Sequence, residues 1–511
     1  MVVYNPLTSP SVGTRDQWEW QSVSLTDFDD QDNPSIPDPA YYQQIMAWEP
    51  VRACLEGTSY LRQNAARYLP QQPMELDASW QGRVSRSVFT PLLQRVIRTA
   101  TGLIMRKPIM LDGDPFWTDT FAKDVDRMGT GLDEFVRKQL FLSIAYGHCS
   151  WLVDFPTGEG IRTLRDQQEA QLQPYFVEID PWSVIGWRQD AKTMAGKLQQ
   201  VRIKEIVSVP KGRFSCEYKQ RVRVIEPDHY EVWERQEEGP VTWVVIEKGP
   251  IAVGEIPLVT TYSGKVGTLF SQPPMAELAH LNLAYFQRHS DLVQALHIAA
   301  QPIMVMAGYD PSPDDKVGLS VNNAICTGPR GESEIYYVEP SVSSFESQRA
   351  ELEGLANSIK SLGLAILTEE KSGVESAKGK ALDRLDSNSI LAVISKDLEK
   401  ALQQAFDFAG EYVGIEPPVV SLDRDFDVEM IDGQMMAAIN TLYQGGLLDQ
   451  ETALQILARG ELFDDTIEIE DILSRSETEQ LQAMEQEIEK TDKMMSVSDE
   501  HESATPKKAE G

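Results

Sequence analysis

Hydrophobic residues between positions 275 and 413 follow a helical period in three separate runs. The first run begins after Pro273-Pro274, where proline is tolerated at a helix start, and ends at Pro302. Its apolar positions are Leu278, Leu281, Tyr285, Leu292 and Leu296, and those of the second run are Leu352, Leu355, Ile359, Leu362 and Ile366. The pattern predicts two helices, 275–300 and 343–366, which form an antiparallel arm whose apolar positions need neighbours.

The third run, Ser376 to Val413, contains no proline and keeps a helical period throughout. Its apolar positions are Leu382, Leu385, Val393, Leu398, Leu402, Phe406 and Ala409. At about 1.5 Å per residue a helix here would span roughly 55 Å, well beyond the usual length in globular proteins. We predict one long helix.

The segment between the two arm helices, 302–342, has a different pattern. Proline, glycine and aspartate interrupt short β-like runs such as Ile335 to Val338, which predicts a small excursion with strands. A polar stretch, Glu369 to Gly373, follows the second arm helix and predicts an exposed loop before the long helix.

The first half of the chain combines helical and strand patterns. Helical periodicity occurs in 78–111 and 132–147, and residues 5–40 have the composition of an extended arm. The predicted strands are 149–155, 175–179, 201–209, 221–225, 229–234, 241–246 and 258–262, with a returning strand within 419–430. A helical pair, 434–443 and 452–457, and an acidic helix with a polar tail after residue 461 complete the chain. The fold class predicted is α+β.

Composition narrows the functional classes. Of the 511 residues, 41% are hydrophobic, which is enough for a hydrophobic core. The formal charge of -32 argues against tight, static binding of DNA, because affinity for DNA comes largely from neutralising phosphates. The four cysteines are far apart without a CxxC pair, which indicates reduced thiols in a cytosolic setting. Neither a signal peptide nor a membrane span is expected from the apolar runs.

One basic segment stands out from this acidic background. Residues 78–111 contain no acidic residue, and their cations are Arg83, Arg86, Arg95, Arg98, Arg106 and Lys107. The first interpretation is that these side chains pair with acids elsewhere in the chain or on a neighbouring subunit. The alternative is contact with phosphate or with a partner protein.

No motif for catalysis, a cofactor or a metal is found. His280 and His289 point to opposite sides of one helix, so they cannot share a metal there. The segment Gly373 to Ala381 has the wrong glycine spacing for a phosphate loop and carries alanine where serine or threonine should hold magnesium. We therefore expect a protein that is not an enzyme.

Several short segments together resemble the portal proteins of tailed bacteriophages (Caudovirales), in a branch that includes prophage portals. They are Arg67-Tyr68-Leu69-Pro70, Met105-Arg106-Lys107-Pro108, Ala145-Tyr146-Gly147-His148, Gly254-Glu255-Ile256-Pro257-Leu258-Val259, Leu278-Ala279-His280-Leu281-Asn282 and Gly445-Gly446-Leu447-Leu448 with Glu451-Thr452-Ala453. The resemblance covers residues 40–460 and rests on the order and spacing of these segments.

The resemblance implies a portal fold in a dodecameric ring, with an α/β wing, a two-helix stem, a small α/β clip, a long wing helix and a helical crown. The segments it implies are 1–40 N-terminal arm, 41–270 wing, 271–300 first stem helix, 301–342 clip, 343–366 second stem helix, 367–378 tunnel loop, 379–431 long helix and returning strand, 432–490 crown and 491–511 disordered tail.

The implied function is a ring at one capsid vertex that forms the channel for DNA packaging and ejection. The implied partners are further copies of the chain, the major capsid protein, a head–tail adaptor, the terminase large subunit and double-stranded DNA, without a membrane or cofactor. The implied location is the virion, and the host cytoplasm during assembly. The expected DNA-contacting residues of the tunnel loop are Glu369, Glu370, Lys371 and Lys378, and the expected partner contacts of the clip are Asp310, Asp314, Asp315 and Arg330.

Two other functions remain open at this point. A scaffolding or adaptor protein of the same particle would form a smaller or open assembly without an axial channel. A soluble nucleotide- or sugar-processing hydrolase would place a pair of catalytic carboxylates in a deep pocket of a monomer.

Overall fold

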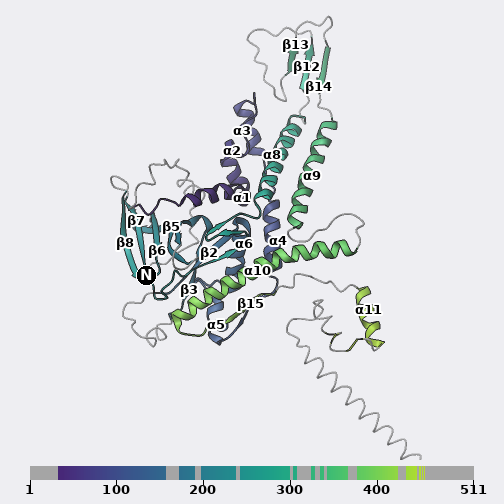
Figure 1. Cartoon of the computed structure of the whole chain (residues 1–511). Helices are drawn as coiled ribbons and strands as arrows, with labels where there is room; N and C mark the ends of the chain where they lie inside the picture. Colours follow the sequence, from purple (N-terminus) through teal and green to yellow (C-terminus); the bar gives the residue numbers. More distant parts are fainter. Residues whose placement is uncertain are drawn as a thin grey trace, which may run out of the picture. The chain divides into compact units, whose positions relative to one another are not determined.

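The computed structural model describes residues 33–156, 172–189, 197–236, 242–299, 303–307, 324–327, 334–338, 342–365, 377–423 and 433–445, together with positions 448, 449, 452 and 454 (Figure 1). The chain forms two compact units, Met1–Arg424 and Asp425–Gly511. In the described part of the second unit, α11 (Gly433–Gln444) matches the helix predicted at 434–443.

The first unit contains most of the described helices. They are α1 (Pro39–Gln63), α2 (Ala65–Tyr68), α3 (Asp77–Arg86), α4 (Leu92–Ile104), α5 (Pro115–Asp119), α6 (Leu132–Tyr146), α8 (Ala276–Ala299), α9 (Val342–Ala365) and α10 (Ala377–Val413), with short 3-10 turns η3 (Phe121–Lys123) and η4 (Pro181–Ser183). The start of α1 is fixed by Asp38, whose carboxylate accepts a 2.9 Å hydrogen bond from the Ala40 amide, and by Pro39 in the first turn.

Two antiparallel sheets form the body of this unit. The first has the order β3-β2-β9, and the second is a five-stranded meander, β4-β5-β6-β7-β8. Their strands are β2 (His148–Asp154), β3 (Tyr175–Ile179), β4 (Val184–Gln189), β5 (Leu198–Lys211), β6 (Ser215–Ile225), β7 (His229–Gln236), β8 (Thr242–Pro250) and β9 (Leu258–Tyr262). Two short pairs, β1 (Met110–Asp112) with β15 (Val419–Ser421) and β10 (Lys265–Gly267) with β11 (Phe270–Ser271), are added to the body.

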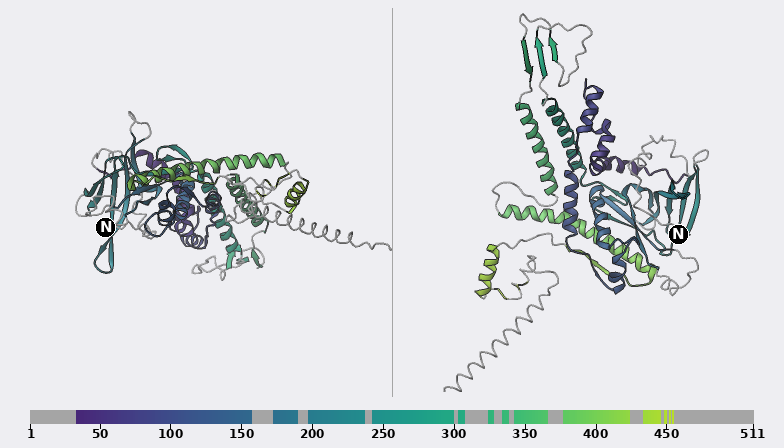
Figure 2. Two further views of the ribbon diagram at one scale, coloured as in Figure 1. Left: turned by 90° about the horizontal axis from the view of Figure 1, so that it is seen from below. Right: turned by 180° about the vertical axis from the view of Figure 1, so that it is seen from behind.

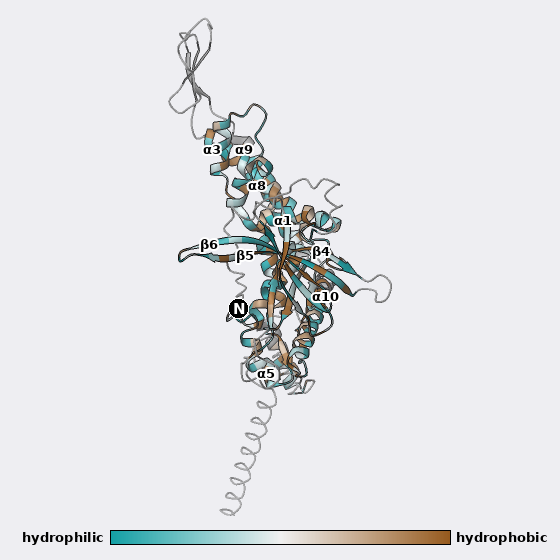
Figure 3. Cartoon of the chain, turned by 90° about the vertical axis from the view of Figure 1, so that its left-hand side faces the viewer, coloured by the Kyte–Doolittle hydropathy of each residue, from teal (hydrophilic) through white to brown (hydrophobic). Residues whose placement is uncertain are grey.

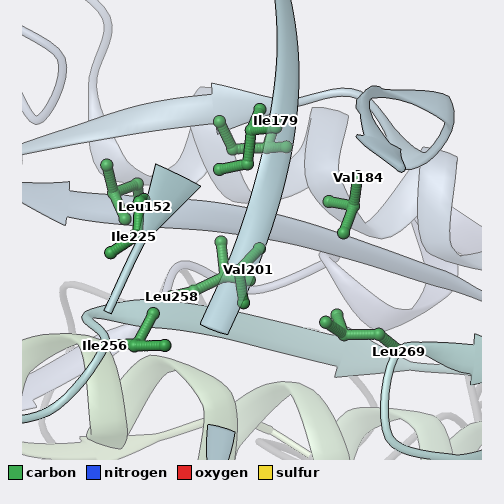
Figure 4. Packing of buried hydrophobic residues seen from close by; sticks show 9 residues of the cluster. Leu152, Ile179, Val184, Val201, Ile225, Ile256, Leu258 and Leu269 are labelled. Carbon is green, nitrogen blue, oxygen red and sulfur yellow. The ribbon is translucent and has the colours of Figure 1, made fainter. Parts of the chain in front are cut away.

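Apolar side chains from both sheets meet in one core (Figure 4). The buried members are Leu152, Ile179, Val184, Val201, Ile203, Ile225, Ile256, Leu258 and Leu269. Alternate residues of the strands point to one face, so Val201 and Ile203 enter the core while Arg202 between them does not. Burial of such a set of branched aliphatic residues holds the two sheets together.

Helix α6 leads directly into the central strand β2 through Gly147. This residue has a φ of 92°, and a Cβ here would lie 2.6 Å from the Ser271 Oγ. Glycine is therefore required both for the left-handed helix end and for the close approach of Ser271 in β11.

The long helix α10 is anchored to the body by its C-terminal half, which packs on β9 and β2. Phe406 of α10 lies in an aromatic cluster with Trp117, Phe121 and Phe176, where ring centroids are 5.2–6.1 Å apart in edge-to-face arrangements. The Trp117 indole also donates a 2.8 Å hydrogen bond to the Glu416 carbonyl just after α10. These contacts fix the orientation of α10 relative to the β3-β2-β9 sheet.

Helices α8 and α9 run side by side as an antiparallel arm (Figures 1 and 2). The chain between them contributes a three-stranded sheet with the order β13-β12-β14, made of β12 (Ile303–Ala307), β13 (Ala324–Thr327) and β14 (Glu334–Val338). Strands β12 and β13 are parallel, and β12 and β14 are antiparallel.

These elements confirm the predicted helices 275–300, 343–366 and Ser376 to Val413 to within one residue at each end. The α+β class is confirmed by the mixture of helices and antiparallel sheets. Strand β4 was not predicted, and β6 begins six residues before the predicted strand 221–225. Of the predicted strand within 419–430, the structure shows β15 (Val419–Ser421).

Candidate functional site

The residues expected to contact DNA or partners lie mostly outside the described part of the chain. In the tunnel loop this applies to Glu369, Glu370 and Lys371, and Lys378 lies in the first turn of α10 without a described side chain. The clip residues Asp310, Asp314, Asp315 and Arg330 also lie outside the described residues. The structure does show the elements that flank these segments, which are α9, α10 and the strands β12 to β14.

The base of the arm is the best-defined candidate site, because α3, α4 and α9 all contact α8 or each other there. Asn282 of α8 is fully buried and joins α8 to the start of α4. Its Oδ1 accepts a 2.9 Å hydrogen bond from the Leu93 amide, and its Nδ2 donates a 3.0 Å hydrogen bond to the Thr90 carbonyl. One side chain thus satisfies an unpaired donor in the first turn of α4.

Helix α3 is attached to α8 by a buried arginine. Arg83 is 4% exposed and forms two hydrogen bonds of 2.9–3.0 Å to the Glu75 carboxylate. The same guanidinium lies 3.6 Å from Asp291 of α8. The hydrogen bond from Arg83 lowers the pKa of Glu75, whereas burial raises the pKa of Asp291.

Further polar contacts complete the base. The Arg86 guanidinium hydrogen bonds to the Gln294 amide oxygen, and the Ser87 and Ser290 hydroxyls are 2.6 Å apart. Between the two arm helices, Arg288 of α8 forms a 3.1 Å ion pair with Glu351 of α9. The arm is therefore held by a set of specific polar contacts as well as by apolar packing.

Pairing with acids elsewhere in the chain, as predicted for the basic segment 78–111, is confirmed for three of its cations. Arg83 pairs with Glu75, and both Arg106 and Lys107 lie within 4.0 Å of Asp423 after β15. Arg86 binds a neutral amide instead of an acid.

Arg95 and Arg98 differ from the other cations of this segment. They are exposed on one face of α4, three residues apart, and neither forms an ion pair with any described residue. They line a shallow hollow of about 290 Å³ together with Pro91, Gln94 and Thr99. None of these lining residues is a carboxylate, so the two guanidinium groups suit a carboxylate or phosphate group from another molecule.

The outer face of the arm is more polar than the sequence pattern suggested. On α9, Leu352 and Ile359 are buried, while most other described side chains are exposed and polar, with Leu362 as an exception at 48% exposure. Ile298 of α8 is similarly exposed at 48%. Four of the predicted apolar positions, Leu278, Leu292, Leu352 and Ile359, are buried within the chain, and the others with a described side chain are partly or largely exposed. That the arm needs neighbours for its remaining apolar positions stays a prediction.

The buried histidine and cysteine at the start of β2 have structural partners. The His148 Nδ1 lies 2.7 Å from the Ser271 Oγ, and burial lowers the pKa of His148 to about 4. Burial also raises the pKa of the adjacent Cys149 thiol, which contacts the Gln139 side chain. A thiol held in its protonated form is a poor nucleophile.

One group with metal-ligand chemistry was not predicted from the sequence. Glu226, Asp228 and His229 meet in the turn between β6 and β7, with one ligand atom of each within 4.8 Å of the others. The hydrogen bond from His229 Nδ1 to Asp228, at 2.8 Å, raises the pKa of His229. The pairing of His229 with the carboxylates of Asp228 and Glu226 accounts for the proximity of the three side chains. In the sequence they are visible as the run Glu226-Pro227-Asp228-His229.

Among the described helices, none is both long enough and apolar enough to cross a membrane.

Comparison with known proteins gives one family and a set of solved structures. Residues 274–413 match the model of a domain of unknown function (DUF4055), which spans the arm, the inserted sheet and α10. None of the curated proteins matches the chain. The matching family covers 140 of the 511 residues, and its description assigns no function to them.

Three solved structures similar to this chain come from one kind of particle. A chain in the neck of the native GTA particle, computed with C12 symmetry, is 12% identical, covers 72% of this chain and 89% of its own, and has a TM-score of 0.35. A chain in the neck of the empty GTA particle, computed with C6 symmetry, is 11% identical at 72% and 90% coverage, with a TM-score of 0.35. A chain in the virion of the native gene transfer agent particle is 12% identical at the same coverage, with a TM-score of 0.36.

Proposed function

We propose that this chain is a portal protein: a dodecameric ring at one capsid vertex whose channel admits DNA during packaging and releases it at ejection. The order of elements from 276 to 413 carries the proposal. A two-helix arm, interrupted by a small three-stranded sheet, is followed by a 37-residue helix anchored to an α/β body. This order corresponds to stem, clip, stem and long wing helix in the portal architecture that the sequence resembles.

The assignment of parts follows from this order. Helices α8 and α9 are the stem, the β12–β14 sheet is the clip, and the two antiparallel sheets with α10 form the wing. The connection from α9 to α10 is the tunnel loop, and the second compact unit is the crown. The ring would sit in the virion and bind the capsid protein, a head–tail adaptor and, during packaging, the terminase large subunit.

The negative charge of the chain supports a channel through which DNA passes without being bound tightly. Affinity for DNA comes largely from neutralising phosphates, so a protein with a formal charge of -32 repels the duplex over most of its surface. A few cations, with Lys371 and Lys378 as the candidates, would then offset the repulsion where the loop meets DNA.

The acids that are buried in the described part of the chain have structural partners, which weighs against their use by a hydrolase. The buried acids Glu49, Glu205 and Glu234 are each bound by arginine, lysine or tyrosine side chains. These carboxylates stabilise the fold and are not free for catalysis.

DNA content of assembled heads tests the proposed function. Heads made without this chain should contain no packaged DNA, and heads with the Lys371→Ala/Lys378→Ala double variant should fill several-fold more slowly. Lys123→Ala, at an exposed lysine near α5, is the matched control and should package normally. Normal filling without the chain would contradict the portal function, whereas normal filling with the double variant would remove only the role of the two lysines.

A further inference from the structure

The hairpin of β5 and β6 extends well beyond the sheet that contains it (Figure 3). Strand β7 pairs with β6 from Arg221 to Ile225, but β6 continues to pair with β5 for six further residues, from Gln220 to Ser215. At about 3.4 Å per residue the tip stands roughly 20 Å beyond the last residue of β6 that pairs with β7. A two-stranded ribbon is marginally stable by itself, so this extension contributes little to the fold.

The tip of this hairpin carries an exposed aromatic residue. Phe214 is 89% exposed, and the Arg213 guanidinium lies 4.9 Å from the centre of its ring. Residues 211–219 contain three cations against one acid. Lys211 lies 3.4 Å from Glu217 and Lys219 lies 2.7 Å from Glu234, which leaves Arg213 as the cation of the tip that no described acid pairs. A local excess of positive charge beside an exposed ring is unusual on a chain with a formal charge of -32, and arginine and aromatic residues are enriched at protein interfaces.

One edge of the same sheet, formed by β8, presents an apolar strip. Strand β8 is an edge strand, and Val244, Val245 and Ile246 are 36–47% exposed in succession. Exposed apolar edge strands favour association with another chain. The tip cannot reach this strip in its own copy, because β6 and β7 lie between β5 and β8 and the tip projects past them.

We propose that the hairpin tip of one copy docks on the β8 strip of the next copy, with Phe214 on Val244, Val245 and Ile246. The two patches differ, so the contact is head-to-tail, and repetition of such a contact closes a ring when the rotation permits. Arg213 brings a positive charge to a neighbour whose formal net charge is -32, which offsets part of the repulsion between copies. The choice of a second copy as the occupant rests on the proposed ring assembly and on this charge complementarity.

An engineered disulfide tests the contact directly. Cys216 is an exposed free thiol two residues from Phe214, and Cys54 and Cys149 are buried. In a full-length Cys326→Ser background, Val245→Cys should form intermolecular disulfides with Cys216 under mild oxidation, because a disulfide requires Cα atoms within about 7 Å. Non-reducing gels should then show a ladder of linked copies. The matched controls are Cys216→Ser with Val245→Cys, and Val419→Cys at another exposed strand residue, and neither should give a ladder.

A second variant tests how much the aromatic side chain of Phe214 contributes to self-association. Phe214→Ser should weaken self-association by tenfold or more, measured by sedimentation at several concentrations, while the unfolding transition of the chain stays unchanged. Met74→Ser, at a side chain that is 98% exposed, is the matched control and should not alter assembly.

The outcomes separate this inference from the proposed function. Rings with an axial hole in which Cys216 forms no disulfide with the Val245→Cys thiol, together with normal assembly of Phe214→Ser, would overturn the hairpin contact and leave the portal function standing. Linkage in open chains or filaments without a hole would support the contact and contradict the ring. Linkage of Cys216 to a different head protein would also overturn the contact between copies.

Discussion

Glu49 in α1 illustrates how single buried side chains hold the helices near the arm. Its carboxylate is 5% exposed and accepts hydrogen bonds from the Tyr60 and Tyr68 hydroxyls at 2.8 and 2.7 Å. The Arg67 guanidinium is 3.4 Å from the same oxygen. One carboxylate thus connects two turns of α1 with α2.

Replacement of this carboxylate should destabilise the protein. Glu49→Ala leaves the buried hydroxyls of Tyr60 and Tyr68 without their hydrogen-bond acceptor. We therefore expect the free energy of unfolding to fall by about 2–3 kcal/mol. Glu353→Ala, at an exposed position in α9, should change it by less than about 0.5 kcal/mol. Urea unfolding followed by circular dichroism measures both, and equal effects of the two variants would contradict this role of Glu49.

His148, the first residue of β2, makes stability depend on pH. Burial lowers the pKa of His148 to about 4 in the folded protein, against about 6.5 in an unfolded chain, so the unfolded state binds more protons between these values. The stability contributed by the neutral ring is complete above pH 6.5 and is lost as pH falls toward 4. Between pH 7 and pH 5 we expect a loss of about 2 kcal/mol from this group.

The variant His148→Gln separates this contribution from other titrating groups. Glutamine can still hydrogen bond to the Ser271 hydroxyl but does not titrate. The loss of stability from pH 7 to pH 5, measured by urea unfolding, should therefore be about 2 kcal/mol smaller in the variant. An identical pH dependence in both proteins would show that His148 is not the group responsible.

At the scale of elements, the packing of α9 against α4 depends on a glycine. A Cβ at Gly363 would lie 2.6 Å from a Val96 methyl group, whereas a Cβ at Gly354 in the same helix would meet nothing within 4 Å. The two glycines therefore differ in their roles, although both lie in α9. Gly363 sets how closely the second arm helix approaches the arginine-bearing helix.

This difference gives a matched pair of variants. Gly363→Ala should destabilise by about 1–3 kcal/mol through overpacking, and Gly354→Ala should stabilise by up to about 1 kcal/mol through helix propensity. Adding Val96→Ala to Gly363→Ala should recover part of the loss, because the smaller side chain makes room for the new methyl group. Thermal unfolding of the three variants tests the packing, and a stabilising Gly363→Ala would contradict it.

The elements that could be predicted from sequence are those whose periodicity is visible locally. Helices α8, α9 and α10 carry long apolar runs at helical spacing, so their bounds were predicted closely. Strand β4 contains Gly186 and follows directly after a 3-10 turn, and the outer half of β6 is exposed and polar, so neither shows the alternation of a half-buried strand. The extended hairpin was missed for this reason.

Contacts between distant parts of the chain could not be predicted in this way. Asn282 bonds to Thr90, 192 residues away, and Gly363 packs on Val96. The basic segment 78–111 was visible in sequence, but which of its cations find acids depends on tertiary structure. Only the fold separates Arg83, which is buried and paired, from Arg95 and Arg98, which face the hollow on α4.

At the scale of the whole molecule, we propose that copies of the chain close into a ring with an axial channel. The acidic composition favours passage of DNA over binding, and the sheet of the body offers two different surfaces at its hairpin tip and its edge. Both features are understandable in a ring and neither is needed by a monomeric enzyme.

The mass of the purified protein by light scattering, with negative-stain images of the same fraction, tests this claim most directly. Twelve copies of 57.3 kDa give about 690 kDa, and the images should show rings with a central hole. A compact monomer at every salt and protein concentration, with no ring in the images, would contradict the account.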